Sequence, residues 1–409
     1  MVRSDTLALI NADLGDGART CVKVNGPQIA AVGDPPGTGE AVLDLEGARL
    51  LPGLINAHDH LQLNHLPRRE PARPYSHARE WIADMDRLRR TDTALKSAVA
   101  VPLAERLLLG GVKNLLSGVT TVAHHDPLHS SLLELQYPVR VLARYGWAHS
   151  LYLDGEGKTR ESQQRTPADW PWIIHAAEGV DEAAVAEFHC LEQLGCLAAN
   201  TLIVHGVALG EAERRRLMEA SAGLIWCPSS NLHLFRATAD VAALAARRRV
   251  ALGTDSRLTG SRDLLAELRI AAERVPLTSE ALQSMVTTDA ARLLRLPDCG
   301  VIAPGLRADL LALPAGLPLE RADRSQIRLV MTGGIALYGE PDLAQALGPP
   351  GHWAKVRVDG RVKALATFIT DRLLRLAAAE PGLEIPPREA SAAAAACLDA
   401  VPGIVRGYA

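Results

Sequence analysis

Residues 53–66 read GLINAHDHLQLNHL, an apolar run that ends in a cluster of histidines. The apolar letters predict a buried strand. Because side chains two positions apart on a strand point to the same face, His58 and His60 present two imidazoles side by side, and Asp59 points the other way. Such a pair can bind one metal ion, yet single strand histidines are more often hydrogen-bonded structural groups. The other strands of the fold must decide between these two interpretations.

The sequence that follows alternates between short apolar runs and longer helical stretches, from residue 53 to residue 302. This alternation is typical of βα units that build a parallel sheet. The later runs are GVTTVAHHD, VRVLARYGWAHSL, WPWIIHAAE, NTLIVHG, AGLIWCPSS and VALGTDS, and the helix candidates cover 93–116, 181–195, 211–221, 238–248, 261–274 and 279–295. About seven or eight such units in about 250 residues predict an α/β fold of the (β/α)8 TIM-like barrel type.

Strand and turn patterns mark both chain ends, in residues 1–52 and again in residues 303–364. We expect these two segments to build one small β-sandwich domain beside the barrel domain of residues 53–302. Residues 365–409 are rich in alanine, which favours a helical tail that serves a dimer interface or covers the β domain. Only about two dozen residues separate Leu151 from His175, less than a further βα unit requires. We therefore expect the fourth barrel strand to be absent or irregular.

Three later apolar runs also end in polar residues, at the strand ends where barrel active sites form. They carry His175 with Glu178 in HAAE, His205 in IVHG and Asp255 in LGTDS. Burying an unpaired polar or charged group costs several kcal/mol, so these side chains need partners. Together with the histidine pair, they predict one shared metal site.

Composition excludes several classes of function. The chain has 409 residues, 48% of them hydrophobic, and a net charge of −3, without a long basic run. A nucleic-acid or membrane-surface role therefore has no support, and a small-molecule partner is expected. The N-terminal residues predict neither a signal peptide nor a membrane span. Six cysteines without a CxxC pair suit a reducing compartment, so we expect a cytoplasmic protein.

Several stretches in the same order carry a resemblance to a known family. They are LLPGLINAHDHL, HAAE, IVHG, CPSSNLHL and LGTDS, with APGLRADLL near the second β segment. The chain resembles the amidohydrolase superfamily, and within it the aminohydrolase branch that includes chlorohydrolases, guanine deaminase and adenosine-analogue deaminases. The stretches cover most of the chain, and their combination is far more specific than any one of them.

The resemblance implies a catalytic metal centre with an open position for water. The residues implied as ligands of one Zn²⁺ or Fe²⁺ are His58, His60, His175 and Asp255. Binuclear relatives need a carboxylated lysine on a middle strand, but no lysine occurs between Lys113 and Lys158. The sequence therefore favours a mononuclear site.

The resemblance also implies roles for three catalytic residues. Asp255 is expected to take the proton of the water that the metal activates. His205 is expected to orient that water or to stabilise developing charge. Glu178 is expected to protonate a ring nitrogen and then the leaving amine. An alternative interpretation makes Glu178 an ordinary carboxylate in the first turn of a helix.

The segment after the histidine pair should determine which substrate binds. The candidates there and beside Asp255 are Gln62, His65, Arg68, Trp81 and Ser256. An amide can hydrogen-bond a ring, and arginine or tryptophan can bind a carboxylate or stack on a ring. His124 and His125 are adjacent and face opposite ways on a strand, so we expect at most one of them to line the pocket.

These observations predict a metal-dependent hydrolase that releases ammonia from an amino-substituted heterocycle such as a purine, pterin or pyrimidine. Opening of a cyclic amide, as in relatives similar to imidazolonepropionase, needs the same groups and stays an alternative. A scaffold without catalysis is a third interpretation, but the sequence lacks none of the expected ligands. We expect a homodimer.

Overall fold

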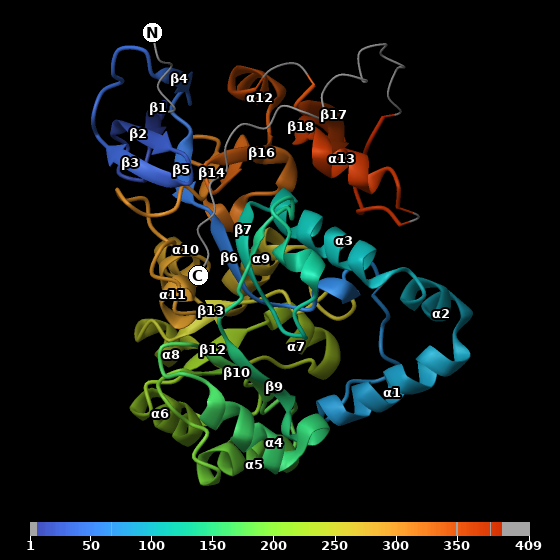
Figure 1. Ribbon diagram of the computed structural model, residues 1–409. Coiled ribbons are helices and arrows are strands. Elements are labelled where there is room, and N and C mark those ends of the chain that lie inside the picture. Colours follow the sequence, from blue (N-terminus) through green and yellow to red (C-terminus); the bar gives the residue numbers. More distant parts are fainter. Residues whose placement is uncertain (1–5, 67, 349–350, 377, 387–409) are drawn as a thin grey trace.

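The computed structural model describes residues 6–66, 68–348, 351–376 and 378–386. Within them, strands β6 to β13 run parallel to their paired neighbours in two sheets (Figure 1). The first sheet contains β6 (Leu54–Asp59), β7 (Val119–His124) and β8 (Arg140–Val141), and the second contains β9 (Gly146–Ser150), β10 (Trp172–Ala176), β11 (Thr201–His205), β12 (Gly223–Trp226) and β13 (Val250–Leu252). A parallel bridge between Asp59 and Asp255 connects the end of β6 to the chain after β13. The strand order and direction are those of a TIM-like barrel.

The fourth strand of this series is present, which corrects the expectation that it is absent or irregular. The run VRVLARYGWAHSL forms two strands, β8 and β9, rather than one. Only residues 142–145 connect them, too few for a helix, and β9 then pairs with β10. In the described residues, the irregular unit therefore lacks its helix and not its strand.

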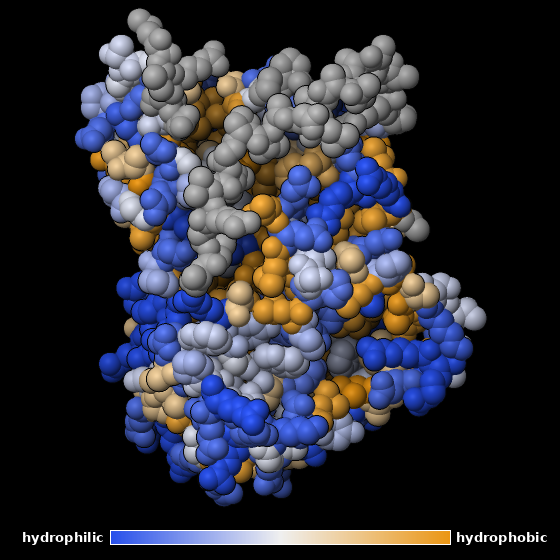
Figure 2. Space-filling model, in the orientation of Figure 1, coloured by the Kyte–Doolittle hydropathy of each residue, from blue (hydrophilic) through white to orange (hydrophobic). Residues whose placement is uncertain are grey.

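Helices cover the outside of the barrel strands (Figure 1). They are α3 (Leu103–Leu116), α4 (Leu151–Arg165), α5 (Glu182–Gln193), α6 (Glu211–Glu219), α7 (Pro228–Phe235), α8 (Ala242–Ala246), α9 (Leu264–Arg274), α10 (Ser279–Met285) and α11 (Thr288–Leu293), with the short 3-10 turns η1 (Leu61–Leu63) and η2 (Ser130–Leu133). Helices α1 (Ala78–Thr91) and α2 (Thr93–Val99) extend away from the barrel as an arm with a mostly hydrophilic surface (Figure 2). Among the described helices, none has the length and apolar character that a membrane crossing requires.

Alternation along the strands decides which side chains reach the barrel interior. On β10, Trp172 and Ile174 pack in the core beneath the helices, whereas Ile173 belongs to a second apolar cluster with residues of β6, β11, β12 and β13. Because successive strand residues point to opposite faces, His175 lies on the interior face with Ile173. The barrel interior thus offers apolar walls below and polar side chains at the carboxyl ends of the strands.

Both chain ends contribute to one eleven-stranded sheet in the described residues. Its strands are β1 (Thr6–Asp13), β2 (Arg19–Asn25), β3 (Gln28–Val32), β4 (Ala41–Asp44), β5 (Arg49–Pro52), β14 (Leu310–Leu313), β15 (Leu329–Thr332), β16 (Ile335–Gly339), β17 (Trp353–Val358), β18 (Arg361–Ala366) and β19 (Leu383–Glu384), and its connections include η3 (Leu319–Arg321), η4 (Arg324–Gln326) and α12 (Pro341–Leu347). The two predicted segments therefore fold together, and their assignment to a separate sandwich domain with the stated boundaries stays a prediction.

The predicted helical tail begins with α13 (Thr367–Leu373), and β19 follows it within the described residues. The rest of the predicted tail, from residue 387, lies outside them. A buried charge cluster ties this C-terminal segment to the barrel. Arg257, two residues after Asp255, donates hydrogen bonds of 2.7 and 2.5 Å to the carboxylate of Glu380, and Arg324 donates one of 2.6 Å to the same group. The loop after β13 is thereby held by the far end of the described chain.

Candidate active site

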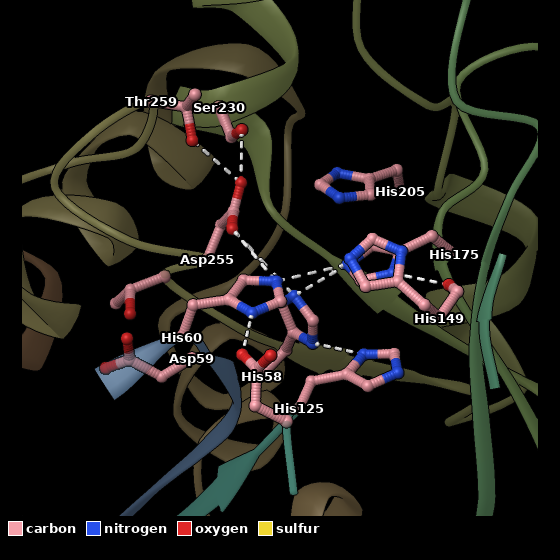
Figure 3. A network of polar contacts seen from close by, with 12 residues as sticks. His58, Asp59, His60, His125, His149, His175, His205, Ser230, Asp255 and Thr259 are labelled. Carbon is pink, nitrogen blue, oxygen red and sulfur yellow. Dashed lines mark hydrogen bonds and ion pairs between the residues drawn. The ribbon is translucent and has the colours of Figure 1, made fainter. Parts of the chain in front are cut away.

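Three histidines and one aspartate direct ligand atoms toward a common point at the carboxyl ends of β6, β10 and β13 (Figure 3). The Nε2 atom of His175 lies 3.3 Å from Nε2 of His58 and 3.3 Å from Nε2 of His60. The Oδ1 atom of Asp255 lies 3.9 and 3.7 Å from the same two nitrogens. Ligands bound at about 2.0 Å to a tetrahedral ion lie about 3.3 Å from one another, so these spacings suit one small cation.

Hydrogen bonds fix which ring nitrogen carries the proton in two of the histidines. The Nδ1 atom of His175 lies 2.7 Å from the carbonyl oxygen of His149, which can only accept, so Nδ1 is the donor. The Nδ1 atom of His60 lies 2.6 Å from a carboxylate oxygen of Asp126. Burial disfavours the charged ring, but the Asp126 carboxylate raises the pKa of His60 to about 9 and increases the basicity of Nε2. Near neutral pH the ring of His60 therefore holds a proton on both nitrogens, and a cation at the centre would take the place of the Nε2 proton, whereas the neutral ring of His175 presents a bare Nε2.

A second imidazole fixes the proton of His58. The Nε2 atom of His125 lies 3.0 Å from the carbonyl oxygen of Ala148 and must donate to it, which leaves Nδ1 of His125 as an acceptor. That Nδ1 lies 3.3 Å from Nδ1 of His58, which is therefore the donor of the pair. Burial lowers the pKa of His58 well below its usual value, so the ring is neutral. Its Nε2 is bare as well.

Asp255 is oriented by two hydroxyl groups. Its Oδ2 accepts hydrogen bonds from Ser230 at 2.6 Å and from Thr259 at 2.8 Å, which leaves Oδ1 toward the histidines. The residue has φ of 58°, in the left-handed region that a side chain other than glycine adopts at a cost of about 1–3 kcal/mol. Backbone strain at this strand end thus contributes to directing the carboxylate inward.

The donor set fits a catalytic metal ion. The nitrogens of three imidazoles and one carboxylate oxygen lie close enough together for a single cation to bind them all, in place of the Nε2 proton of His60. An N₃O set of this kind suits Zn²⁺ or Fe²⁺, and a water molecule would bind as a fifth ligand. His58 also groups with His175 and His205 at distances compatible with metal binding. Among the described residues, these two groups are the ones whose spacing suits an ion.

Glu178 and His205 lie beside this centre. The Nε2 atom of His205 lies 3.5 Å from Oε1 of Glu178, and its Nδ1 lies 2.8 Å from Oδ1 of Asn231. Burial raises the pKa of Glu178 to about 7, so its carboxyl group holds a proton near neutral pH. The residue precedes the first turn of α5, which begins at Glu182, so the alternative of an ordinary helix carboxylate is wrong. His205 has φ of 74°, which turns its side chain out of the strand alternation.

A small, partly open cavity lies beside Glu178 and His175. Its other lining residues are His77, Ala78, Arg79, Ile82, His149, Ser150, Tyr152 and Glu187. The segment before α1 lies along the residues that follow β10, because the amide of Ala78 donates to the carbonyl of Glu178 at 3.0 Å. The amide of Val180 donates in turn to the carbonyl of Ser76 at 2.8 Å. The segment before α1, which follows the histidine pair and is expected to determine substrate choice, therefore lies against the backbone of Glu178, the proposed proton donor.

None of the predicted substrate residues is among the residues that line this cavity. Gln62 donates a hydrogen bond of 2.7 Å to Asp126 and so supports the partner of His60. The other four are placed as follows: His65 bonds the carbonyl of Ala98 at 2.7 Å, Arg68 bonds His233 at 3.0 Å, Trp81 packs against Met85 and Leu66, and Ser256 is buried. Their roles in substrate binding stay predictions.

Of the two adjacent histidines after β7, His125 faces the site and contacts His58 and His175, whereas His124 contacts backbone atoms of Asp59 and Leu61. The sequence reasoning missed Asp126, which follows them in the letters AHHD, although the rule that polar strand ends meet at one edge already pointed to it. His149 is the next-to-last residue of β9 and was hidden inside a run interpreted as one strand. Arg79 and Tyr152 carry no signal of this kind, because their place in the cavity depends on how α1 and α4 begin.

Comparison with known proteins agrees with this geometry. The amidohydrolase family pattern matches residues 167–337. A 5-methylthioadenosine/S-adenosylhomocysteine deaminase of Desulfitobacterium hafniense is 26% identical over 364 residues, which cover 74% of this chain and 84% of the relative. An 8-oxoguanine deaminase of Pseudomonas aeruginosa is 33% identical over 154 residues, about a third of each chain. The family match and these relatives show that the chain is similar to amidohydrolases, and among them to deaminases.

Solved structures share the fold. A zinc-bound atrazine chlorohydrolase of Arthrobacter aurescens superposes with a TM-score of 0.65 at 19% identity, over 81% of this chain and 95% of the other. An adenosine deaminase of Xanthomonas campestris with bound zinc superposes with a TM-score of 0.62 over 81% of this chain and 92% of the other. The chain is similar to the amidohydrolase family over residues 167–337 and to deaminases over about three quarters of its length. These similarities support a metal-dependent hydrolase of C–N bonds.

Proposed function

We propose that the protein deaminates an amino-substituted heterocycle, a purine, pterin or pyrimidine, with one Zn²⁺ or Fe²⁺ held by His58, His60, His175 and Asp255. The observation that carries the proposal is the position of Glu178, a carboxyl group with a pKa of about 7, beside four converging ligand atoms. A deaminase needs both an activated water and a proton donor for the ring. The names of the deaminase relatives support the same reaction class.

A metal ion held by His58, His60, His175 and Asp255 would supply a bound water molecule with a pKa lowered toward about 7. Asp255 is placed to take the proton of that water, since its Oδ1 faces the centre while Oδ2 is held by hydroxyl groups. The bare Nε2 of His205 accepts a hydrogen bond from the water and keeps it directed at the ring carbon. Glu178 gives its proton to the adjacent ring nitrogen, then takes the remaining hydroxyl proton as the carbonyl forms and transfers it to the leaving amine. The proton that Asp255 took from the water finally returns to Glu178, which restores both carboxyl groups. Water and the amino compound thus yield the oxo compound and ammonia.

The experiment is an ammonia assay with separately zinc-loaded and iron-loaded protein and a panel of aminopurines, pterins, pyrimidines and lactams. We expect ammonia from at least one aminoheterocycle and about one metal ion per chain. A ring-opened product without ammonia would support cyclic-amide hydrolysis instead. Folded protein that binds less than one ion per chain, and converts nothing, would support a scaffold role. The cytoplasmic location and the homodimer stay proposals, and size-exclusion chromatography with light scattering tests the dimer.

A further inference from the structure

Helix α9 carries a completely buried carboxyl group, that of Glu267, which has no part in the mechanism described above. Its Oε1 atom accepts a hydrogen bond of 2.7 Å from the backbone amide of Ser229. Burial raises the pKa of this carboxyl group to about 7, so its neutral and its charged form are both present near neutral pH. Either form can accept the bond from Ser229. An acidic side chain is almost never fully buried without a partner, and here the partner is a backbone amide.

The amide of Ser229 belongs to the first turn of helix α7, which lacks a cap of its own. The residue before the helix, Cys227, makes no capping hydrogen bond with its side chain, and Pro228 at the first position has no amide hydrogen. The first turn is buried, so its amides cannot bond to water instead. Glu267 therefore takes the place of an N-cap residue, from a position 38 residues further along the chain.

The next two residues of α7 orient two groups of the reaction centre. The hydroxyl of Ser230 donates a hydrogen bond of 2.6 Å to Oδ2 of Asp255 (Figure 3). The Oδ1 atom of Asn231 accepts a hydrogen bond of 2.8 Å from Nδ1 of His205, while its amide nitrogen donates to the hydroxyl of Thr238 at 3.2 Å. Ser230 and Asn231 are both completely buried. A shift in the first turn of α7 would thus move Asp255 and His205 at once.

We propose that Glu267 is a positioning residue of the reaction centre: it fixes the first turn of α7 and, through Ser230 and Asn231, sets the directions of Asp255 and His205 together. What Asp255 and His205 do to the water rests on the proposed deamination, whereas the series of hydrogen bonds does not. A displacement of about 1 Å at reacting groups can cost about a hundredfold in rate. Because both groups act on the water, we expect the effect in kcat rather than in KM.

The test compares Glu267→Met with Glu267→Gln in the zinc-loaded protein, on a substrate of the panel that yields ammonia. Methionine has a similar length but is a weak acceptor, whereas glutamine offers an amide oxygen at the same position. We expect Glu267→Met to lower kcat about ten- to a hundredfold with KM within about twofold of wild type, and Glu267→Gln to restore most of the loss. Glu273→Met, at an exposed position of the same helix, is the matched control and should behave as wild type.

A merely structural role would reduce the amount of folded protein but not kcat per bound zinc ion. Unchanged kcat in Glu267→Met, or a glutamine variant as impaired as the methionine variant, therefore overturns the assignment. Glu267→Asp, which withdraws the carboxyl group by one methylene, replaces the methionine variant if that protein does not fold, with the same expected direction and the same rule for rejection.

A double variant shows whether Glu267 acts through α7. Ser230→Ala removes a hydroxyl that holds Asp255, so its combination with Glu267→Met should lose less activity than the product of the two separate losses. Losses that multiply would mean that the two residues act independently, which overturns the assignment.

The visible absorption spectrum of the cobalt-loaded protein tests the same relation without turnover, since it reports how Asp255 binds the ion. We expect Glu267→Met and Ser230→Ala to shift the spectrum in the same direction, and Glu267→Gln to leave it as in wild type. If wild type releases no ammonia, the proposed function fails, and these spectra alone decide on Glu267. An unshifted spectrum for Glu267→Met, or a wild type that binds no cobalt, then overturns its positioning role.

Discussion

The ammonium group of Lys113 lies 3.1 Å from Oδ2 of Asp59, and both side chains are completely buried behind the two histidines of β6. The same ammonium group contacts Asn64 at 2.8 Å and the hydroxyl of Thr254 at 2.9 Å. Asp59 accepts a further hydrogen bond of 2.8 Å from Asn114. The ion pair thus joins three segments: the end of β6, helix α3, and the residue before Asp255.

Lys113→Met should lower both the thermal stability and the metal affinity of the protein. The substitution leaves the carboxylate of Asp59 buried without its counter-charge, which costs about 3–5 kcal/mol. Thermal denaturation and zinc titration measure the two effects. The double variant Lys113→Met with Asp59→Asn is the control and should recover part of the stability, because neither partner then carries an unpaired charge. A single variant as stable as wild type would contradict the prediction.

His125→Phe should weaken metal binding about 10–100-fold, because it removes the acceptor that fixes the tautomer of His58. Competition with a chromophoric chelator measures the affinity without any assay of catalysis. His125→Asn retains an acceptor near the position of Nδ1 and is expected to stay closer to wild type. Identical affinities for the phenylalanine variant and wild type would show that His58 needs no such partner.

Gly253→Ala should disrupt the metal centre, because a Cβ atom there would lie 2.7 Å from Cβ of His58 and 3.0 Å from its backbone. The backbone of β6 cannot yield without moving its ligands, so we expect lower stability and lower zinc content. Gly157→Ala is the matched control, since a Cβ atom at Gly157 in α4 meets nothing within 4 Å. That change should be neutral or slightly stabilising, by up to about 1 kcal/mol. The two variants differ in sign if the close approach is real.

The raised pKa of Glu178 predicts that activity falls above neutral pH. Burial raises its pKa from 4.5 to about 7, and the proposed proton donor must be protonated, so kcat/KM should decrease as the pH rises through about 7. The same shift affects stability. The unfolded chain loses this proton near pH 4.5 and the folded chain near pH 7, so the free energy of unfolding should decrease between these values and then level off.

Glu178→Gln should abolish turnover and remove that decrease in stability, while zinc content stays that of wild type. Glutamine fills the same space but cannot release a proton. Chemical denaturation at a series of pH values gives the stability of both proteins. Retained turnover in the variant would exclude Glu178 as the proton donor, and parallel stability curves would place the titrating group elsewhere.

The sequence was sufficient for the barrel and for the residues that converge on the site, because both follow from short-range patterns. Strand alternation places His58 and His60 on one face, and the strand-end rule collects His175, Glu178 and Asp255 at the same edge. The hydrogen bonds confirm that Asp59 points away from the site, since it pairs with Lys113. These patterns did not predict the residues that hydrogen-bond the proposed metal ligands. Those residues come from other strands, which no short-range pattern connects to the ligands.

Elements with weak local signals were missed for physical reasons. Helix α7 contains two serines and an asparagine, which favour caps and turns, and seven of its eight residues are buried. Packing rather than propensity therefore stabilises it. Helix α4 is largely polar and is kinked at Gly155, so it resembled a loop, although Ser150 caps its first turn. Strand β8 has two residues, too short for any periodicity to indicate it.

The pairing of Arg257 with Glu380 also has a consequence for how the protein is made. The two residues lie 123 positions apart, and the arginine lies two residues after Asp255 in the loop after β13. At typical rates of synthesis, the ribosome needs on the order of ten seconds to cover that distance. Until then, the nascent barrel contains all three histidine ligands but a carboxylate loop that lacks its last anchor. The segment around Glu380 is thus made late, and only then can it anchor the loop that carries Asp255.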